Sequence, residues 1–339
     1  MVARRLFKLV GFTALVIASS MFARADTTLP LWAYGTDPAS RSSANLPGGE
    51  PVLAALIKSN APLHLPGSTL SFTPAQTRDV YAPADWFPNE HPPMPELVAH
   101  GRKADGIVAC ALCHHPDGYG RPENANLRGL GASYIVRQLE AFKNGERTSA
   151  DPEKSNTRVM IAASKGLTHE EMLEVAAYYA KMRATQTYER VVESASAPKV
   201  WSESTGAVYA LAAPNDGKEP LAHKIVEVPE DTIKAEVYRN PHEIYIAYVP
   251  EGSIARGQAL ATTGGGMTIA CTTCHGNGLN GSSVAPALAG RSPSYIARQL
   301  ADIQMGTRAN AKAMNGVVDG LTPDDIVDIS AYIGSLSPR

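Results

Sequence analysis

The chain has 339 residues, and 44% of them are hydrophobic, which is enough apolar material for about two small domains. It carries 31 basic and 33 acidic residues, for a formal net charge of −2. This balance argues against a nucleic-acid partner, because phosphate recognition requires clustered lysine and arginine.

Residues 1–25 have the pattern of a secretory signal peptide. Three basic residues precede an apolar run from Leu9 to Met21, and Ala23-Arg24-Ala25 forms a small-x-small cleavage site. The run is too short to span a bilayer comfortably, and no other segment has the pattern of a transmembrane helix. Cleavage would leave 27 basic against 33 acidic residues, a formal charge of −6. We expect an exported, periplasmic protein with no integral membrane segment after cleavage.

Residues 26–95 are expected to form an irregular N-terminal segment. They are rich in proline and glycine up to residue 66, and only residues 52–58 have a helical pattern. The stretch Thr73-Pro74 with Val80-Tyr81 resembles Val228-Pro229 with Val237-Tyr238. We interpret both stretches as extended segments, each packing on the domain that follows it.

The four cysteines fall in two Cys-x-x-Cys-His motifs, Cys110-Ala-Leu-Cys113-His114 and Cys271-Thr-Thr-Cys274-His275. This pentapeptide is the attachment site of c-type haem. Its two thiols form thioethers to the porphyrin, and its histidine binds the iron. A thioredoxin-type redox pair or a zinc site is the alternative, but neither requires a histidine directly after both pairs. The sequence therefore predicts two covalently bound haem c groups.

Helical patterns follow each motif. A first helix containing Gly101 or Gly257 is expected before the motif. Apolar spacing then predicts helices over about 133–144 and 293–305, with Gly145 and Gly306 near their ends and Ser292-Pro293 at one start. The last helices begin with capping sequences at Thr168 and Thr322. Their expected buried faces are Leu173, Ala176 and Ala177 in one, and Ile326, Ile329 and Ile333 in the other.

The two halves are a tandem duplication. An offset of 161 residues aligns the two motifs, the helices after them, and the pairs Gly145/Gly306 and Arg147/Arg308. The offset then falls to 154, because the first copy has seven more residues around 149–156. We therefore place cytochrome c domain 1 at 96–185 and domain 2 at 251–339. Residues 186–250 join them, with an irregular linker at 186–221.

Met160 and Met314 are the predicted sixth ligands of the two irons. Each lies seven residues before the leucine of a Gly-Leu-Thr sequence, on a stretch expected to be irregular. A thioether suits a histidine-ligated haem of high potential. Met305 has Asn144 as its counterpart and is not chosen. Methionine usually fills gaps in a core, which is our interpretation of Met172, Met182 and Met267.

Several other polar residues have weaker assignments. Arg137 and Arg298, or Tyr134 and Tyr295, could donate hydrogen bonds to haem propionates, since a buried carboxylate needs donors. An exposed arginine and a packed tyrosine explain the pattern equally well. His115 follows a ligand directly and is expected to be a surface imidazole.

These residues resemble the two-domain, two-haem cytochromes c of the cytochrome c4 type. The resemblance rests on sequences such as Ala287-Leu288-Ala289-Gly290, Ser294-Tyr295-Ile296-Ala297-Arg298-Gln299-Leu300 and Glu140-Ala141-Phe142-Lys143-Asn144-Gly145. It implies a mainly α fold with two tandem class I cytochrome c domains and His/Met ligation. It also implies a crossing of first and last helices at a glycine and an aromatic, for which Gly101 with Tyr178 and Gly257 with Tyr332 are suited.

The chain departs from that family in two features. The linker is longer than the family's, so the arrangement of the domains does not carry over. Pro286 is suited to offer its carbonyl to His275, whereas Ala125 stands at the matching place in the first copy, and a backbone carbonyl there can do the same.

The expected function is electron transfer between redox partners, without catalysis. The chain would act as a soluble carrier or as the haem subunit of a dehydrogenase or terminal oxidase complex. Its net charge favours a partner with a basic docking face. The alternative is a di-haem enzyme, such as a peroxidase or a thiosulfate-oxidising protein. A methionine matched in both copies argues against that, since such enzymes need an exchangeable or unusual ligand.

Overall fold

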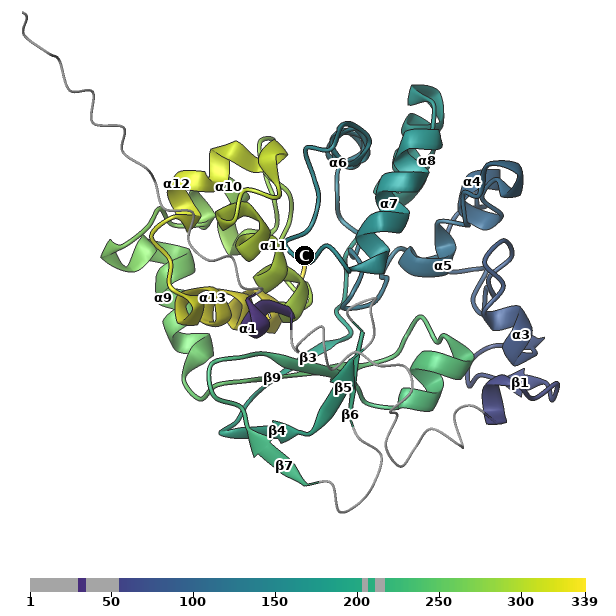
Figure 1. Cartoon of the computed structure of the whole chain (residues 1–339), viewed down its shortest axis with the longest axis horizontal. Helices are drawn as coiled ribbons and strands as arrows, with labels where there is room; N and C mark the ends of the chain where they lie inside the picture. Colours follow the sequence, from purple (N-terminus) through teal and green to yellow (C-terminus); the bar gives the residue numbers. More distant parts are fainter. Residues whose placement is uncertain (1–29, 35–54, 203–206, 211–216) are drawn as a thin grey trace, which may run out of the picture.

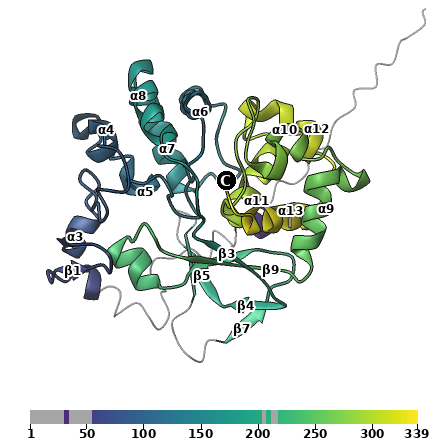
Figure 2. The same ribbon diagram turned by 180° about the vertical axis from the view of Figure 1, so that it is seen from behind.

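The computed structural model describes residues 30–34, 55–202, 207–210 and 217–339. The predicted signal peptide and residues 52–54 of the predicted N-terminal helix lie outside this part, while residues 55–57 are helical. The chain is mainly helical. Figures 1 and 2 show the helices of the two repeats on opposite sides, with a group of short strands along one edge of both.

The first repeat contains α4 (Glu96–Ala99), α5 (Ala111–His114), α6 (Ala132–Asn144), α7 (Ser155–Gly166) and α8 (His169–Ala180). Its caps are those predicted: Gly145 ends α6 in the left-handed region, and Thr168 and Glu171 form a capping box before α8. The seven extra residues of this repeat lead into α7. The expected first helix is reduced to the single turn of α4.

The second repeat contains α9 (Ser253–Thr263), η4 (Gly264–Gly266), α10 (Thr272–His275), η5 (Asn277–Leu279), α11 (Pro293–Gln304), η6 (Ala309–Met314), α12 (Asn315–Val318) and α13 (Pro323–Ser335). Ser292 caps α11 by accepting from the Tyr295 amide, and Thr322 and Asp325 form a capping box before α13. Both caps were predicted.

In the second repeat Gly257 lies where α9 crosses α13, with the backbone of Asp328 and Ile329 as its nearest neighbours. A Cβ on Gly257 would lie 1.9 Å from the Asp328 carbonyl oxygen, so only glycine lets α9 cross α13 at this distance. Gly101 instead follows α4 with φ of +62°, and its nearest neighbours are the backbone of residues 107–109. The expected crossing of Gly101 with Tyr178 is therefore wrong.

Each repeat has its own apolar core. Ile326, Ile329 and Ile333 are buried in the second, as predicted. In the first, Leu173 and Ala177 are exposed, and only Ala176 of the predicted face is buried. The helix is rotated so that two large rings, Tyr178 and Tyr179, are buried, because they remove more apolar area from water than Leu173 would.

The methionines expected in the cores behave differently from one another. Met172 and Met182 are buried in the first core, as predicted. Met267 is 57% exposed, so its expected role as a core residue is wrong.

The linker expected to be irregular contains five short strands: β3 (Glu189–Glu193), β4 (Ser196–Pro198), β5 (Val200–Ser202), β6 (Val208–Ala210) and β7 (Lys218–Pro220). β3 pairs in parallel with β9 (Tyr245–Val249), which also pairs antiparallel with β8 (Val226–Pro229). Alternate residues of β9 and all four residues of β8 are buried, whereas β3 lies at the edge of this sheet with none of its residues fully buried.

The N-terminal segment contains α1 (Leu31–Tyr34), β1 (Leu63–His64), β2 (Ser71–Phe72) and α3 (Pro74–Thr77), and the 3-10 turn η2 (Lys103–Asp105) follows α4 in the first repeat. Its similarity to residues 228–238 predicted two extended segments, each on its own core. Instead the two stretches pack on each other. Thr77 donates to the Val237 carbonyl at 2.7 Å, and Trp86 donates to the Tyr238 carbonyl at 2.7 Å. Residues 234–238 form the π-helical turn η3 (Lys234–Tyr238) rather than a strand.

Candidate haem-binding sites

The two Cys-x-x-Cys-His motifs form the matching one-turn helices α5 and α10. One helical turn places both cysteines and the histidine of each motif on the wall of one cavity. None of the four cysteines, all of which lie in the described part of the chain, is paired in a disulfide. Burial raises the pKa of Cys110 to about 12, opposite in direction to the lowered pKa of a redox-active thiol.

Each motif histidine is held by a backbone carbonyl. His114 Nδ1 lies 2.8 Å from the Ala125 oxygen, and His275 Nδ1 lies 2.8 Å from the Pro286 oxygen. A carbonyl can only accept, so Nδ1 carries the proton and Nε2 keeps its lone pair for a metal. Burial lowers the pKa of both rings, which favours the neutral form that a ligand needs. The backbone carbonyl of Ala125 therefore holds its histidine at the same distance as the carbonyl of Pro286 does.

Met160 and Met314 line the same cavity as the two histidines. Met314 ends η6, immediately before α12. Met160 lies within α7, so the irregular stretch expected around it is wrong. The extra residues before it supply a helical turn in the first repeat, and the sulfur still reaches the cavity. Met305 caps α11 and is not among the residues that line the cavity.

The cavity has a volume of about 530 Å³ and is shared by the two repeats. Its walls are largely apolar, with residues such as Leu139 and Val175 from one repeat and Leu300 and Ile329 from the other. Two sets of two cysteines, a histidine and a methionine thus face one apolar space. These residues and apolar walls fit two haem groups. A haem is flat and largely apolar; the two cysteines would link to its porphyrin as thioethers, and the histidine and methionine would bind its iron.

A reciprocal hydrogen-bond network joins the repeats across this cavity. Arg147 donates to the Tyr295 hydroxyl at 3.1 Å and to Gln299 at 2.8 Å. Arg308, its counterpart in the repeat, donates to the Tyr134 hydroxyl at 2.9 Å and to Gln138 at 3.2 Å. The two arginines also form an antiparallel backbone bridge. The repeats therefore meet about a local pseudo-two-fold relation.

Positive charge collects where the repeats meet. Six basic residues line the cavity, and the two acids that line it, Glu123 and Asp302, are buried. The basic residues are Arg137, Arg147, Lys154, Arg291, Arg298 and Arg308. Burial lowers the pKa of Lys154 to about 7. Buried cations in excess need counter-charges. The carboxylates of haem propionates would supply them.

The four residues considered as propionate donors differ in where they lie relative to the cavity. Tyr134, Tyr295 and Arg298 line the cavity, and Arg298 also donates to the Pro122 carbonyl at 2.5 Å. Arg137 lies at its rim and is exposed. Sequence reasoning aligned Arg147 with Arg308 without assigning them a role. Their identity in both copies, just after a helix-ending glycine, was the signal.

His115 is buried, with 4% of its surface exposed, so the expected surface position is wrong. It lies near Arg239 and His242, and residues of the 186–250 segment close over the loop after the first motif. Among the residues that the structure describes, neither ring nitrogen has a hydrogen-bond partner. Burial lowers its pKa far below the ordinary value, so the ring is neutral.

The chain matches the cytochrome c family over residues 100–183 and again over 254–337. It is 25% identical to cytochrome c4 of Pseudomonas aeruginosa over 238 residues, covering 68% of this chain and 84% of that protein. It is 33% identical to the cytochrome subunit of sulfide dehydrogenase of Chlorobaculum tepidum over 101 residues, covering 25% of this chain and 91% of that protein. The solved cytochrome c4 of Acidithiobacillus ferrooxidans aligns with a TM-score of 0.44 and 21% identity, covering 67% of this chain and 98% of that one.

The tandem fold, the paired motifs and these relatives define a di-haem electron-transfer cytochrome. The chain belongs to the cytochrome c family, with two of its domains in tandem and two covalently bound haem c groups. The resemblance to cytochromes c4 is confirmed. Within the described residues, none of the helices is both long and apolar enough to cross a membrane.

Proposed function

We propose that both irons are closed by protein ligands, so that the chain carries electrons and does not act as a catalyst. His114 and Met160 would bind one iron, and His275 and Met314 the other. Cys110, Cys113, Cys271 and Cys274 would form the thioethers. The observation that carries this proposal is that a histidine and a methionine from each repeat line the same cavity.

The bound haem supplies an iron that accepts and releases one electron. The protein's part is to keep the surroundings constant while this happens. The Ala125 and Pro286 carbonyls fix the rings of His114 and His275. A thioether from methionine favours the reduced iron and so raises the potential. The apolar walls exclude water.

The cations where the repeats meet would hold the propionates of both haems. Arg147 and Arg308 already donate hydrogen bonds across the repeats, Arg147 to the Tyr295 hydroxyl and Arg308 to the Tyr134 hydroxyl. Propionates held by this network would bring the polar edges of the two haems to one interface. Electrons could then pass between the haems inside the protein.

The proposed location is the periplasm, reached through the signal peptide at residues 1–25. A redox protein would deliver and remove electrons, either by transient docking or as a permanent partner. The dehydrogenase-subunit version is supported by the relative from Chlorobaculum tepidum, which is named as a subunit of sulfide dehydrogenase.

Carbon monoxide binding separates the carrier from an enzyme. The reduced protein should not bind carbon monoxide at neutral pH and should show negligible peroxidase turnover, because a ligand must reach the iron to react. The Met160→Ala variant, which opens one iron, is the positive control and should bind it. Ready binding by the wild-type protein, or fast peroxide consumption, would favour the enzyme instead.

A further inference from the structure

The loop after the motif is covered in the first repeat and open in the second. At the 161-residue offset, residues 115–123 correspond to 276–284. All nine residues of the first loop are buried, whereas in the second only Leu279 is. The two loops have the same position relative to their motif histidines, so this difference comes from what lies over them.

The N-terminal segment and residues 186–250, which join the two domains, form the cover over the first loop. Arg121 pairs with Glu236 of η3, and Arg239 donates to the Leu112 carbonyl within the first motif at 2.5 Å. Tyr119 donates to the Gln186 carbonyl at 3.0 Å.

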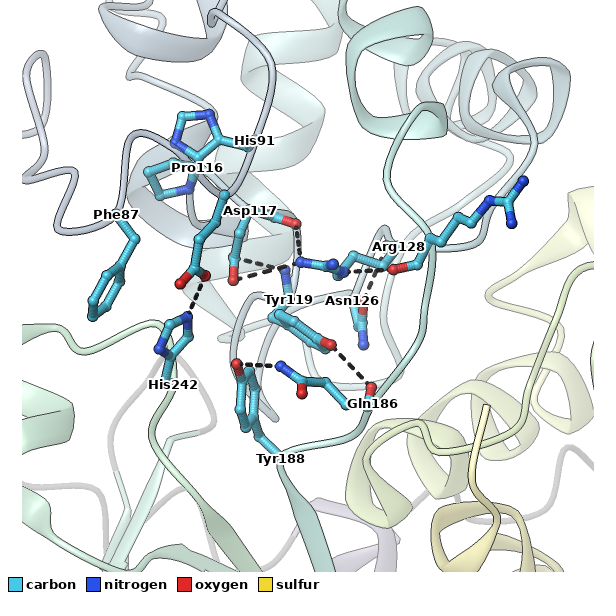
Figure 3. Close-up of polar contacts among 12 residues, drawn as sticks. Phe87, His91, Pro116, Asp117, Tyr119, Asn126, Arg128, Gln186, Tyr188 and His242 are labelled. Carbon is cyan, nitrogen blue, oxygen red and sulfur yellow. Dashed lines mark hydrogen bonds and ion pairs between the residues drawn. The ribbon is translucent and has the colours of Figure 1, made fainter. Parts of the chain in front are cut away.

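Aromatic rings close the same cover from the side (Figure 3). Tyr119 packs on Tyr188 with centroids 4.4 Å apart, and His242 packs between Tyr188 and Phe87. Residues of the N-terminal segment and of residues 186–250, which flank the first domain, therefore cover its motif loop together.

The second repeat exposes the matching edge of its cavity. We call Ile269, Cys274 and Val284 the second-repeat rim, because all three line the cavity. Ile269 is 52% exposed, Val284 is 76% exposed, and Cys274 is exposed as well. The counterparts of the two apolar residues are Val108, which is half-buried, and Glu123, which is buried.

The second-repeat rim lies in an uncharged stretch. Residues 257–290 contain no aspartate, glutamate, lysine or arginine, although 19% of the whole chain is charged. At the same offset the corresponding stretch of the first repeat, residues 96–129, contains eight such residues, Glu96, Arg102, Lys103, Asp105, Asp117, Arg121, Glu123 and Arg128. Exposed Met267, beside Ile269 in sequence, enlarges the apolar surface to one side. Apolar side chains at the mouth of a cofactor cavity mark an interaction site.

We infer that this protein exchanges electrons with its partners through one port, the second-repeat rim. The partner is a one-electron redox protein whose own docking face is apolar and uncharged. This rests on the proposed function. One electron would leave the partner's cofactor and reduce the haem that His275 and Met314 would hold. Its onward transfer to the haem that His114 and Met160 would hold would free the port for a second electron.

Docking at the second-repeat rim would differ from the docking with a basic face that the net charge of the chain favours. A basic face would find no acidic residue within 257–290 to meet it. Burial of apolar surface drives the docking instead, and it is insensitive to salt, unlike docking of opposite charges.

Protein-film voltammetry of the haem-loaded full chain tests this, with gold electrodes coated by methyl-, carboxylate- or amine-terminated alkanethiols as the partner face. The methyl surface should give the fastest exchange, changing less than about twofold between low and high salt. Val284→Asp or Ile269→Asp should slow exchange at the methyl surface about tenfold or more, because docking would desolvate the new charge. Leu173→Asp is the matched control, since Leu173 is 49% exposed on α8 of the first repeat, and it should keep the wild-type rate.

The sharpest readout is that both haem signals slow together in Val284→Asp. A first-repeat signal that keeps its rate would show a second entrance and overturn the single port. Faster exchange at the carboxylate or amine surface would overturn the apolar partner. Visible spectra and both potentials check that the variants are folded and loaded. If carbon monoxide binds the wild-type protein, the carrier role itself fails. If it does not, and the rim variants exchange normally, the port alone is wrong.

Discussion

Two methionines, Met160 and Met314, face the cavity from elements of different kinds, one from a helix and one from the end of a 3-10 turn. Replacing either with alanine should remove one haem's share of the near-infrared sulfur-to-iron band and lower that haem's potential, because the soft ligand is lost. Near-infrared absorption and a redox titration measure both effects. Met305→Ala is the control and should change neither. Loss of the band in that variant would mean that the wrong methionine was chosen.

Asp117 should make stability depend on pH. Burial raises its pKa from the ordinary 3.8 to about 6, although Arg128, His242 and His91 oppose the shift. The folded carboxyl keeps its proton where the unfolded one has lost it, so its contribution to the free energy of unfolding falls as pH rises from about 4 to 6.

The Asp117→Asn variant tests that dependence, because asparagine cannot titrate and its oxygen can still accept from the Tyr119 amide. The unfolding free energy of the variant minus that of the wild type should rise by about 2–3 kcal/mol between pH 4 and pH 7. Denaturant titrations at the two pH values provide the measurement. A difference that does not change with pH would show that Asp117 titrates normally.

The roles of individual residues could be predicted from the sequence where a short local spacing of residue types defines the role. The two motifs, the matched methionines and the capping residues at Thr168 and Thr322 are local patterns, and the structure puts each motif with its methionine on one cavity. The positions of His115 and Leu173 could not, because they depend on what packs over them. His115 lies beneath a cover made by distant parts of the chain.

At the level of elements, the crossing of α9 and α13 depends on Gly257. Gly257→Ala should lower the free energy of unfolding by on the order of 3 kcal/mol, since its Cβ would overlap the Asp328 carbonyl. Gly316→Ala, in α12, is the control because a Cβ there meets nothing within 4 Å. It should be neutral or stabilising by up to about 1 kcal/mol. Thermal unfolding of the haem-loaded proteins compares them, and equal effects would exclude a special role for the crossing.

The elements that sequence reasoning missed are held by partners far along the chain. β3 pairs with β9, more than fifty residues away, and η3 packs on α3 at an even greater separation. Short runs such as Glu189–Glu193 have weak local preference, so pairing decides their structure. The helices of the repeats, by contrast, have periodicity and caps within their own residues.

For the whole molecule, the contact between the repeats should set the potentials. Arg147→Gln removes a buried cation beside both parts of the cavity. Loss of this positive charge stabilises the oxidised haems, because they are more positive than the reduced ones. The potentials should fall by on the order of 50 mV at the nearer haem. Arg137→Gln is the control, because its exposed charge is screened by solvent. A spectroscopic redox titration resolves both haems. Equal shifts in the two variants would place Arg147 away from the propionates.

The face-to-face contact was beyond sequence reasoning, although the duplication was plain. An internal repeat gives two similar domains without stating which surfaces meet. Here the matched pair Arg147 and Arg308 meets across the repeats, and each arginine uses the tyrosine of the other copy. The same residues in a tandem with a different linker could point into solvent.

The cover over the first motif also constrains how the protein matures. Arg239, well over a hundred residues after Cys113, lies against the first motif, so a fully folded chain would present this site half-buried and the Cys274 site exposed. Thioether formation needs access to both thiols and to the porphyrin edge. We therefore expect the first cofactor to be attached before residues 186–250 pack over the motif, which a chain that still lacks its second half would allow. The second motif stays accessible after folding, so we expect that its cofactor can be attached later than the first.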